Sequence, residues 1–306
     1  MMETADVFRF QIEPEMEENR IDKCMSLLLD SLSRSYIQKL IKEGKVSVNG
    51  NPVKANYKVR TDDEIMFFLP KAVEPDIRPE NLPLNILYED DDLLFVNKPK
   101  DMVVHPAAGH YSGTLVNAVM YHCAGKLSGI NGVMRPGIVH RIDKDTTGVL
   151  VICKNDTSHN LVAAQLKEHS ITRKYRAICF GNLKEESGTI HASIGRSQND
   201  RKKMAICESG GKDAITHYRV LKQLNGYSYI ECELETGRTH QIRVHMASIG
   251  HPLLGDTVYT ARKQPFSLNG QTLHAMVLGL IHPTTGKYLE IEAPLPEYFT
   301  DLLNKL

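Results

Sequence analysis

Several features that mark whole classes of proteins are missing from this sequence of 306 residues. No stretch approaches the ~20 consecutive apolar residues that a transmembrane helix needs. Residues 1–18 are acidic and lack the basic and apolar regions of a secretory signal. The six cysteines form no C-x-x-C pair and no H-E-x-x-H occurs, so neither a disulfide framework nor a zinc site is expected. We therefore expect a cytoplasmic protein without a metal cofactor.

Net charge is also absent, because 37 basic residues balance 37 acidic ones, but the charges are unevenly distributed. Residues 19–60 carry nine Lys or Arg against three Asp or Glu, whereas the flanking segments are acidic. Residues 167–203 form a second basic segment, with nine basic against four acidic residues. A basic segment between acidic ones is typical of a local anion-binding surface, although many charged runs are only solvated faces.

The pattern of residues 19–69 predicts two helices followed by a β-ribbon. Apolar residues of the two helices recur at helical spacing: Ile21, Cys24, Met25 and Leu28, then Ile37, Leu40 and Ile41. Ser35 and Gln38 predict a capping box for the second helix, and Gly44 predicts its end. Residues 46–53, with the turn pair Asn49-Gly50, predict a tight hairpin, and residues 65–69 predict a further strand.

Residues 20–67 resemble the S4 RNA-binding domain, including the S-R-S before the second helix and the V-x-V-N-G of the hairpin. The resemblance implies that four basic side chains face RNA phosphates: Arg34, Lys39, Lys42 and Lys45. Without the resemblance, the same pattern describes a helical hairpin on a β-ribbon with a solvated basic side. The coincidence of helix, cap, hairpin and charge favours the S4 domain.

Four prolines between residues 70 and 83 predict an extended linker, which divides the chain into residues 1–75 and residues 76–306. In the second part, apolar and polar residues alternate over residues 229–234 and 289–293, as in half-buried strands. Helices are expected at residues 114–122, 157–169 and 296–306. These elements predict an α+β domain with a mixed, largely antiparallel sheet.

The densest polar cluster lies in residues 135–156, directly before the apolar run of residues 149–153. It contains His140, Arg141, Asp143, Lys144 and Asp145. A charged loop that is anchored on a buried strand is a candidate active site, but its spacing alone also fits a surface turn with local ion pairs. Residues 143–147 also match D-x-D-x-T, the magnesium-dependent nucleophile motif of haloacid-dehalogenase-type phosphatases.

A longer match covers residues 136–148, PGIVHRIDKDTTG, which resemble the H-R-L-D-x-x-T-S-G signature of the RluA-type pseudouridine synthases. Residues 97–99, 104–106, 173–175 and 236–256 agree as well, and the S4 segment points to the branch that acts on large-subunit ribosomal RNA. The resemblance implies isomerisation of uridine in structured RNA, without a cofactor, by a monomer. A catalytically silent RNA-binding or ribosome-assembly factor with the same surfaces is the alternative.

The resemblance also implies roles for individual residues. Asp143 would attack the ribose C1′ or take a proton from C2′, and Arg243 would lie beside it. Tyr175 would stack on the target base, with Ile242 as the opposite wall. The RNA itself would contact His140 and also Arg141, which enters the gap left by the flipped nucleotide. Four further basic residues are assigned more loosely to RNA phosphates, with a merely solvated surface as the alternative: Arg238, Arg201, Lys202 and Lys203.

Overall fold

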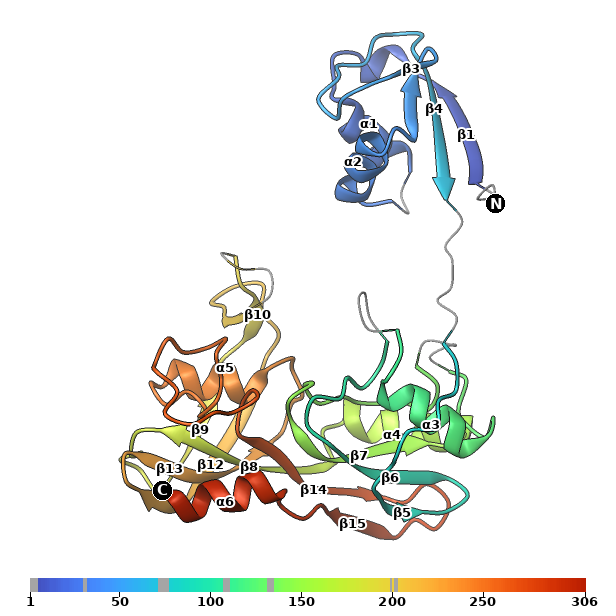
Figure 1. Ribbon diagram of the computed structural model, residues 1–306. Helices are drawn as coiled ribbons and strands as arrows, with labels where there is room; N and C mark the ends of the chain where they lie inside the picture. Colours follow the sequence, from blue (N-terminus) through green and yellow to red (C-terminus); the bar gives the residue numbers. More distant parts are fainter. Residues whose placement is uncertain are drawn as a thin grey trace. The chain divides into compact units, whose positions relative to one another are not determined.

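The computed structural model describes residues 5–29, 32–70, 77–106, 111–130, 135–198, 200 and 203–306. The chain divides into two compact units, residues 1–74 and residues 75–306 (Figure 1). The boundary expected between residues 75 and 76 lies outside the described residues. Within the described parts of the chain, no helix is long and apolar enough to cross a membrane.

The N-terminal unit packs two helices on a small antiparallel sheet. Its elements are β1 (Ala5–Gln11), a 3-10 turn (Pro14–Met16), α1 (Ile21–Leu28), α2 (Arg34–Lys42), β2 (Val46–Val48), β3 (Asn51–Pro52) and β4 (Glu64–Pro70). The strand order is β1-β4-β2-β3. Asn49 and Gly50 both have positive φ, as the tight turn between β2 and β3 requires.

Three details of this unit differ from the sequence prediction. Strand β1 was not expected, and its pairing with β4 starts the folded unit well before residue 19. The cap of α2 is Ser33, whose hydroxyl accepts a hydrogen bond from the Tyr36 amide, so the capping box at Ser35 is wrong. Leu28 is 41% exposed, because α1 ends there and its stripe no longer faces the core.

The C-terminal unit is built on one large sheet. Its elements are β5 (Ile86–Glu89), β6 (Leu93–Lys98), α3 (Leu115–Cys123), β7 (Thr147–Cys153), α4 (Asp156–Lys167), β8 (Thr172–Phe180), β9 (Ser187–His191), β10 (Ile194–Arg196), β11 (Met204–Ile206), β12 (Ile215–Leu224), β13 (Tyr227–Leu234), α5 (Gln241–Ser248), β14 (Leu273–Ile281), β15 (Tyr288–Glu292) and α6 (Glu297–Lys305). The nine-stranded sheet has the order β5-β6-β7-β14-β8-β13-β12-β9, with β15 beside β14. Strands β10 and β11 form a separate ribbon.

Strands β7 and β14 are parallel, with His274 opposite Thr147. The other neighbouring strands of this sheet, within the described residues, are antiparallel. The predicted α+β fold with a mixed, largely antiparallel sheet is thereby confirmed. A haloacid-dehalogenase fold has a parallel sheet, so the phosphatase interpretation of residues 143–147 is wrong.

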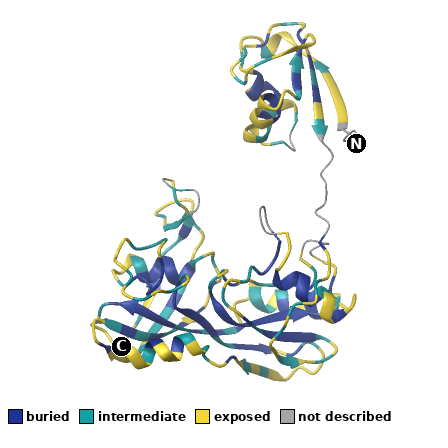
Figure 2. Ribbon diagram, in the orientation of Figure 1, coloured by how far each residue is buried: buried dark blue, intermediate teal, exposed yellow. Residues whose placement is uncertain are grey.

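Both faces of the sheet are covered. Successive residues of a strand point to opposite faces, and in β8 the side chains of Ala177 and Cys179 join the main core while Ile178 and Phe180 pack toward Phe299 of α6. All seven residues of β7 are buried, as Figure 2 shows by its unbroken dark ribbon. Strand β7 therefore gives the loop before it a rigid support.

The predicted linker is shorter than expected. Ile77 is 5% exposed and belongs to the core of the C-terminal unit. The Glu80 amide donates to the Asn117 carbonyl at 2.9 Å, and the Asn117 side chain donates to the Arg78 carbonyl at 2.8 Å. Residues 77–83 therefore pack on the C-terminal unit, and residues 71–76 of the predicted linker lie outside the described part.

Candidate active site

The loop before β7 is held at several points. His140 Nε2 accepts a hydrogen bond from the Val151 amide of β7 at 3.0 Å. The Lys98 ammonium donates to the Lys144 carbonyl at 2.8 Å. Because both contacts fix the backbone on either side of Asp143, the loop presents this carboxylate from a defined position.

Lys98 is fully buried at the end of β6. Its ammonium donates to three backbone carbonyls, those of Pro99 at 2.8 Å, Met102 at 2.9 Å and Lys144 at 2.8 Å. Burial lowers the pKa of Lys98 to about 7, and the Asp145 carboxylate opposes this shift. The three acceptors match the three N–H groups of an ammonium, so they favour the charged form that ties the two loops together.

Asp143 shares one guanidinium with a second carboxylate. Arg243 Nη1 donates to Asp143 Oδ2 at 2.9 Å. Arg243 Nε and Nη2 donate to the two oxygens of Asp256 at 2.7 and 3.0 Å. Burial would lower the pKa of Arg243, but the hydrogen bonds and the charges of the two carboxylates outweigh it and raise the pKa. Since the Asp256 side chain is fully buried, this bidentate contact fixes the guanidinium that meets Asp143.

His240 lies on the other side of the Asp143 carboxylate. Its Nε2 is 3.8 Å from Asp143 Oδ1, and its Nδ1 is 2.6 Å from the Tyr259 hydroxyl. Burial lowers the pKa of His240, although the charge of Asp143 opposes this effect. The Tyr259 hydroxyl accepts from the Met204 amide, and the Tyr259 ring lies 5.0 Å from the Arg243 guanidinium carbon. His240 and Tyr259, which the sequence did not predict as site residues, therefore lie near Asp143 as well.

The Asp143 carboxylate opens into a cavity with apolar walls. The cavity holds about 360 Å³ of empty space, part of which is open to solvent. Its lining residues come from the loop before β7, from β8, from the end of β13, from the start of β14, and from the segment that includes α5: Arg141, Ile142, Asp143, Thr146, Tyr175, Leu234, Arg238, His240, Gln241, Ile242, Arg243 and Leu273. Asp143, Tyr175 and Arg243, the residues predicted to be catalytic, thus meet in one place, together with Ile242.

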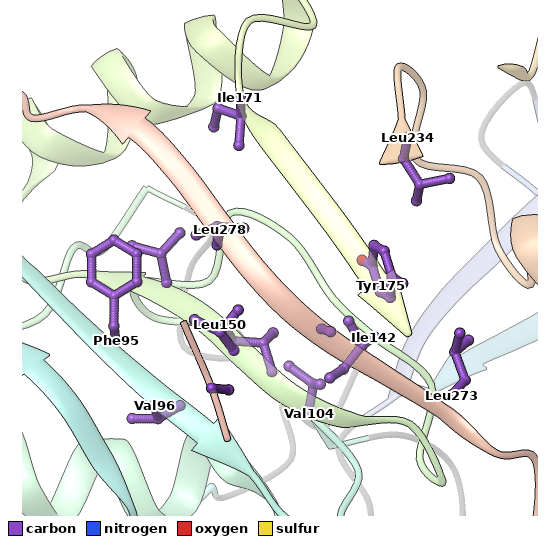
Figure 3. Close-up of a cluster of buried hydrophobic side chains, with 14 of the residues drawn as sticks. Phe95, Val96, Val104, Ile142, Leu150, Ile171, Tyr175, Leu234, Leu273 and Leu278 are labelled. Carbon is purple, nitrogen blue, oxygen red and sulfur yellow. The ribbon is translucent and has the colours of Figure 1, made fainter. Parts of the chain in front are cut away.

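Tyr175 is a wall of this cavity. It is 9% exposed, belongs to β8 and lies among Ile142, Leu234 and Leu273, as Figure 3 shows. Burial raises the pKa of Tyr175; the nearby Arg173 cation opposes the shift and Asp143 adds to it. Tyr175 is therefore a neutral phenol that offers an aromatic surface to the cavity.

A second, wider cavity adjoins the first and shares Asp143 and Tyr175 with it. Its lining is mostly basic or polar: Val139, His140, Arg141, Asp143, Leu166, Lys167, His169, Arg173, Tyr175, Leu234, Gly237, Arg238, Thr239 and His240. The cleft that runs from the Asp143 carboxylate to the surface therefore suits a polyanion better than a neutral ligand.

Arg141 and Arg238 lie where a substrate would enter. Arg141 is exposed, and its Nη1 donates to Nε2 of His105 at 3.2 Å. Arg238 lines both cavities, and its Nε donates to the Asp213 carbonyl at 2.8 Å. Each arginine keeps N–H groups beyond the one that is used in these contacts.

His140 takes a role in the fold. Burial and the neighbouring Arg173 cation lower the pKa of His140 to about 4. The ring is therefore neutral near pH 7, and its Nε2 lone pair is occupied by the Val151 amide. The sequence assigned His140 to RNA binding; the structure shows that one edge of the ring stabilises the loop.

We expect the His140→Gln variant to have a flatter dependence of stability on pH. In the native protein His140 titrates near 4, below the ~6.5 of an unfolded histidine, so its contribution is complete above pH 6.5 and is lost as the pH falls toward 4. Wild-type protein should lose about 3 kcal/mol more unfolding free energy than the variant between pH 7 and pH 4. Urea unfolding of both proteins across this range measures the difference, and parallel curves would contradict the assignment.

The basic residues predicted to bind RNA in the N-terminal unit lie on and just after α2. Arg34 donates to the buried carboxylate of Asp22 at 3.1 Å and remains 48% exposed. Lys39 and Lys45 contact Glu43 at 3.7 and 3.2 Å. Lys42 is exposed and forms none of the ion pairs found among the described residues. These four residues thus lie in one region of the unit, three of them in ion pairs.

Some predicted residues lie outside the described part of the chain, and some residues of the site were not predicted. Arg201 and Lys202 lie outside the described residues, and Lys203 is partly buried. Asp256 was not singled out, although it ends the stretch 236–256 that carried the resemblance. His240 was not singled out either, although it lies in the same stretch. A signal was therefore present in the sequence for both residues, but it lay in the motif and not in the spacing.

Comparisons with known proteins agree with this geometry. A profile of the family described as RNA pseudouridylate synthase matches residues 92–248, and an S4 domain profile matches residues 20–65. The solved structure of human RNA pseudouridylate synthase domain containing 1 is 28% identical, with a TM-score of 0.58 over 73% of this chain and 87% of that chain.

Relatives in bacteria are closer in sequence. The chain is 51% identical to an uncharacterised RNA pseudouridine synthase of Bacillus subtilis, with 95% of each chain covered. It is 49% identical to ribosomal large subunit pseudouridine synthase D of Zymomonas mobilis, with 92% of each chain covered. The chain therefore belongs to the RNA pseudouridylate synthase family and is an RNA-modifying isomerase with an S4 domain.

Proposed function

We propose that this pseudouridine synthase isomerises uridines of large-subunit ribosomal RNA and that Asp143 is its essential carboxylate. The observation that carries the assignment is the position of Asp143 in a cavity with partly apolar walls, where it contacts a buried guanidinium that Asp256 fixes. The choice of RNA is supported by the relatives from Zymomonas mobilis and Pasteurella multocida, which are named ribosomal large subunit pseudouridine synthase D.

The chemistry explains why an ionised carboxylate is needed. The reaction breaks the bond between uracil N1 and ribose C1′, turns the base, and joins C5 to C1′. A carboxylate at the ribose can attack C1′ or remove a proton from C2′, and the geometry is compatible with both routes. Arg243 supplies the positive charge that a carboxylate needs beside apolar walls.

The other cavity residues hold the base and the RNA. Tyr175 offers its ring to one face of the uracil, and Ile242 forms the other wall. The detached uracil is thus confined between apolar surfaces while it turns. The exposed Arg141 fills the place that the flipped nucleotide leaves in the RNA helix. This contact offsets the cost of unstacking that nucleotide, which is a few kcal/mol. His140 acts through the loop, and Arg238 contacts a phosphate at the entrance of the cavity.

Mapping pseudouridines tests the choice of substrate. RNA from cells with and without the gene is compared, and the gene is restored as wild type or as Asp143→Asn. We expect discrete positions of large-subunit RNA to lose pseudouridine without the gene and to regain it only with the wild type. Loss confined to transfer RNA or small-subunit RNA would contradict the proposed substrate.

The S4 unit supplies binding energy from a separate folded body. Its own core is formed by α1, α2 and the small sheet, and its basic residues Arg34, Lys39, Lys42 and Lys45 contact phosphates. Because this RNA-binding unit belongs to the same chain as the catalytic unit, it raises the local concentration of RNA at the catalytic cavity. One chain contains both parts, so a cytoplasmic monomer is sufficient for the reaction.

Deletion of residues 1–75 should separate binding from chemistry. We expect weaker binding to the structured natural RNA, and a salt dependence that falls by roughly 0.7 to 0.9 in slope for each lost phosphate contact. The single-turnover rate at saturating RNA should stay within about 5-fold of the full chain, because no S4 residue takes part in the chemical step.

A short stem-loop that reaches only the cavity is the matched substrate for this deletion, and its binding should change least. Filter binding over a salt series gives the slopes. If the truncated protein stays folded but loses the chemical step on both RNAs, the S4 unit helps to build the active site and the tether account is wrong.

A further inference from the structure

Arg173 is a buried cation near the cavity, and the reaction at Asp143 gives no reason for its burial. It begins the R-K-Y stretch on β8, two residues before Tyr175, and is only 7% exposed. Among the described residues, no carboxylate lies within ion-pair distance of it. A buried cation without a carboxylate is costly, since an arginine does not release its proton inside a protein.

The guanidinium is held in place by one of its ends. Arg173 Nη2 donates to the carbonyls of Glu235 at 2.7 Å and Leu234 at 3.4 Å. Nε is buried and has no hydrogen-bond partner among the residues that the structure describes. Both carbonyls lie at the end of β13, so the strand fixes the plane of the guanidinium and leaves Nη1 for another partner.

Gly237 leaves room at that free end. A Cβ atom at this position would lie 2.6 Å from Arg173 Nη1. Gly237 and Arg173 both line the wider cavity that also contains Asp143. The lack of a side chain therefore keeps the space beside Nη1 open, in the wall of the cleft that leads to the reacting carboxylate.

The charges around this space select an anion. Lys167, His169 and Arg238 line the same cavity, and Asp143 is the single carboxylate among its lining residues in the described part of the chain. A planar guanidinium with a free N–H edge, itself buried in the wall of a basic cleft, binds phosphate oxygens well. RNA offers one phosphate per nucleotide, and those nearest the target uridine must enter this cleft.

We propose that Arg173, with the gap left by Gly237, is a preformed binding site for one RNA phosphate next to the uridine that reaches Asp143. The proposal rests on the function proposed for the Asp143 cavity. It adds a phosphate subsite inside the cleft, apart from the surface contacts of Arg141, Arg238 and the S4 unit. A phosphate bound there places the ribose against Asp143 and neutralises the buried cation.

The test removes charge from the protein and from the RNA in turn. A short substrate RNA is made with a methylphosphonate, which is neutral, at each phosphate near the target uridine in separate molecules. Binding of the full chain is measured for wild type, Arg173→Met and Gly237→Ala. Lys167→Met is the matched control, because it removes an exposed cation from the same cavity without the fixed geometry of Arg173.

We expect one methylphosphonate position to weaken wild-type binding about 10-fold and to cause almost no further loss in Arg173→Met. Arg173→Met should bind unmodified RNA about 10-fold more weakly, with a salt slope lower by about 0.7 to 0.9. Gly237→Ala keeps the charge and both carbonyl contacts of Arg173. Its RNA affinity should still fall about 3-fold, through the contact with the phosphate at that same RNA position, because Nη1 is displaced. Lys167→Met should show no coupling to that position.

Two outcomes would overturn the proposal. Arg173 would be only a structural clamp on β13 if no single phosphate is coupled to it, or if Gly237→Ala binds like wild type at every position. If Arg173 contacts the base and not a phosphate, each methylphosphonate should weaken RNA binding by the same factor in wild type and in Arg173→Met. Measurable turnover by Asp143→Asn would refute the proposed function but not this phosphate site, so the two failures are distinguishable.

Discussion

Asp143→Asn should abolish isomerisation, with a loss of more than about 1000-fold in the single-turnover rate, while RNA affinity stays within a few-fold. An amide keeps the shape of the carboxylate but acts neither as a nucleophile nor as a base. The remaining site should stay in place, because Arg243 keeps its bidentate contact with Asp256 when its charged contact with Asp143 is replaced by a neutral one. The measurement is pseudouridine formation at saturating enzyme, with binding measured on the same RNA.

Asp145→Asn is the matched control for this prediction. Asp145 belongs to the same loop but is absent from the residues that line the cavity. Its replacement removes one negative charge at nearly the same place in the chain, so a general electrostatic effect would appear in both variants. We expect Asp145→Asn to keep its rate within about 10-fold. Turnover by Asp143→Asn close to that of Asp145→Asn would remove Asp143 from the chemistry.

Regular patterns in the sequence predicted regular structure well. The stripe Ile37, Leu40 and Ile41 is buried in α2, and the alternation of Ile230, Cys232 and Leu234 is buried in β13. In each case one face of the element is fully buried and the other is less buried, and a period of 3.6 or 2 records this difference. A pattern of this kind is local, so it can be read without the rest of the fold.

Helix α5 was not predicted because it has no exposed face. Its residues 241–246 are all buried in succession, and they include a glutamine, an arginine and a histidine. Polar residues at consecutive buried positions give no amphipathic period. Each is instead satisfied by a specific partner: Gln241 bonds to Thr216 and Thr236, and His245 bonds to Thr216. Thr216 is 25 and 29 residues away from these two side chains, so it becomes visible as their partner only when the chain is folded.

The same limit explains the errors in the N-terminal part. Strand β1 is an edge strand whose exposed residues, such as Val7 and Phe8, carry no buried stripe, and it is fixed by pairing with β4. Residues 77–83 are rich in proline, yet Ile77 enters the core of the C-terminal unit. Composition describes how stiff a segment is, but it does not say against what surface the segment packs.

The candidate site shows a similar division. Motif resemblance named Asp143, Tyr175, Ile242 and Arg243, which do line one cavity. It did not name Asp256, although that carboxylate decides where the guanidinium points. Residues that touch the substrate recur in short motifs, whereas the residues that orient them act through contacts across the fold. These supporting contacts are the part that the structure adds.

Arg243→Lys tests that supporting role and should have the second large effect. The arginine uses Nε and Nη2 for Asp256 and Nη1 for Asp143, whereas an ammonium is a point donor that cannot bridge both carboxylates in this geometry. We expect the rate at saturating RNA to fall by about 100-fold or more, and the unfolding free energy to fall by about 3 kcal/mol, because a fully buried Asp256 loses part of its partner.

Asp256→Asn separates the two roles of the arginine. It leaves the contact between Arg243 and Asp143 possible but removes the charge that fixes the guanidinium, while the amide oxygen can still accept from the Val258 amide. Positioning through Asp256 predicts that this variant also loses at least about 10-fold in rate at saturating RNA, with little change in RNA affinity. If Arg243→Lys stays near the wild-type rate while it remains folded, a positive charge alone suffices. If only Asp256→Asn stays near that rate, Asp143 itself holds the guanidinium in position.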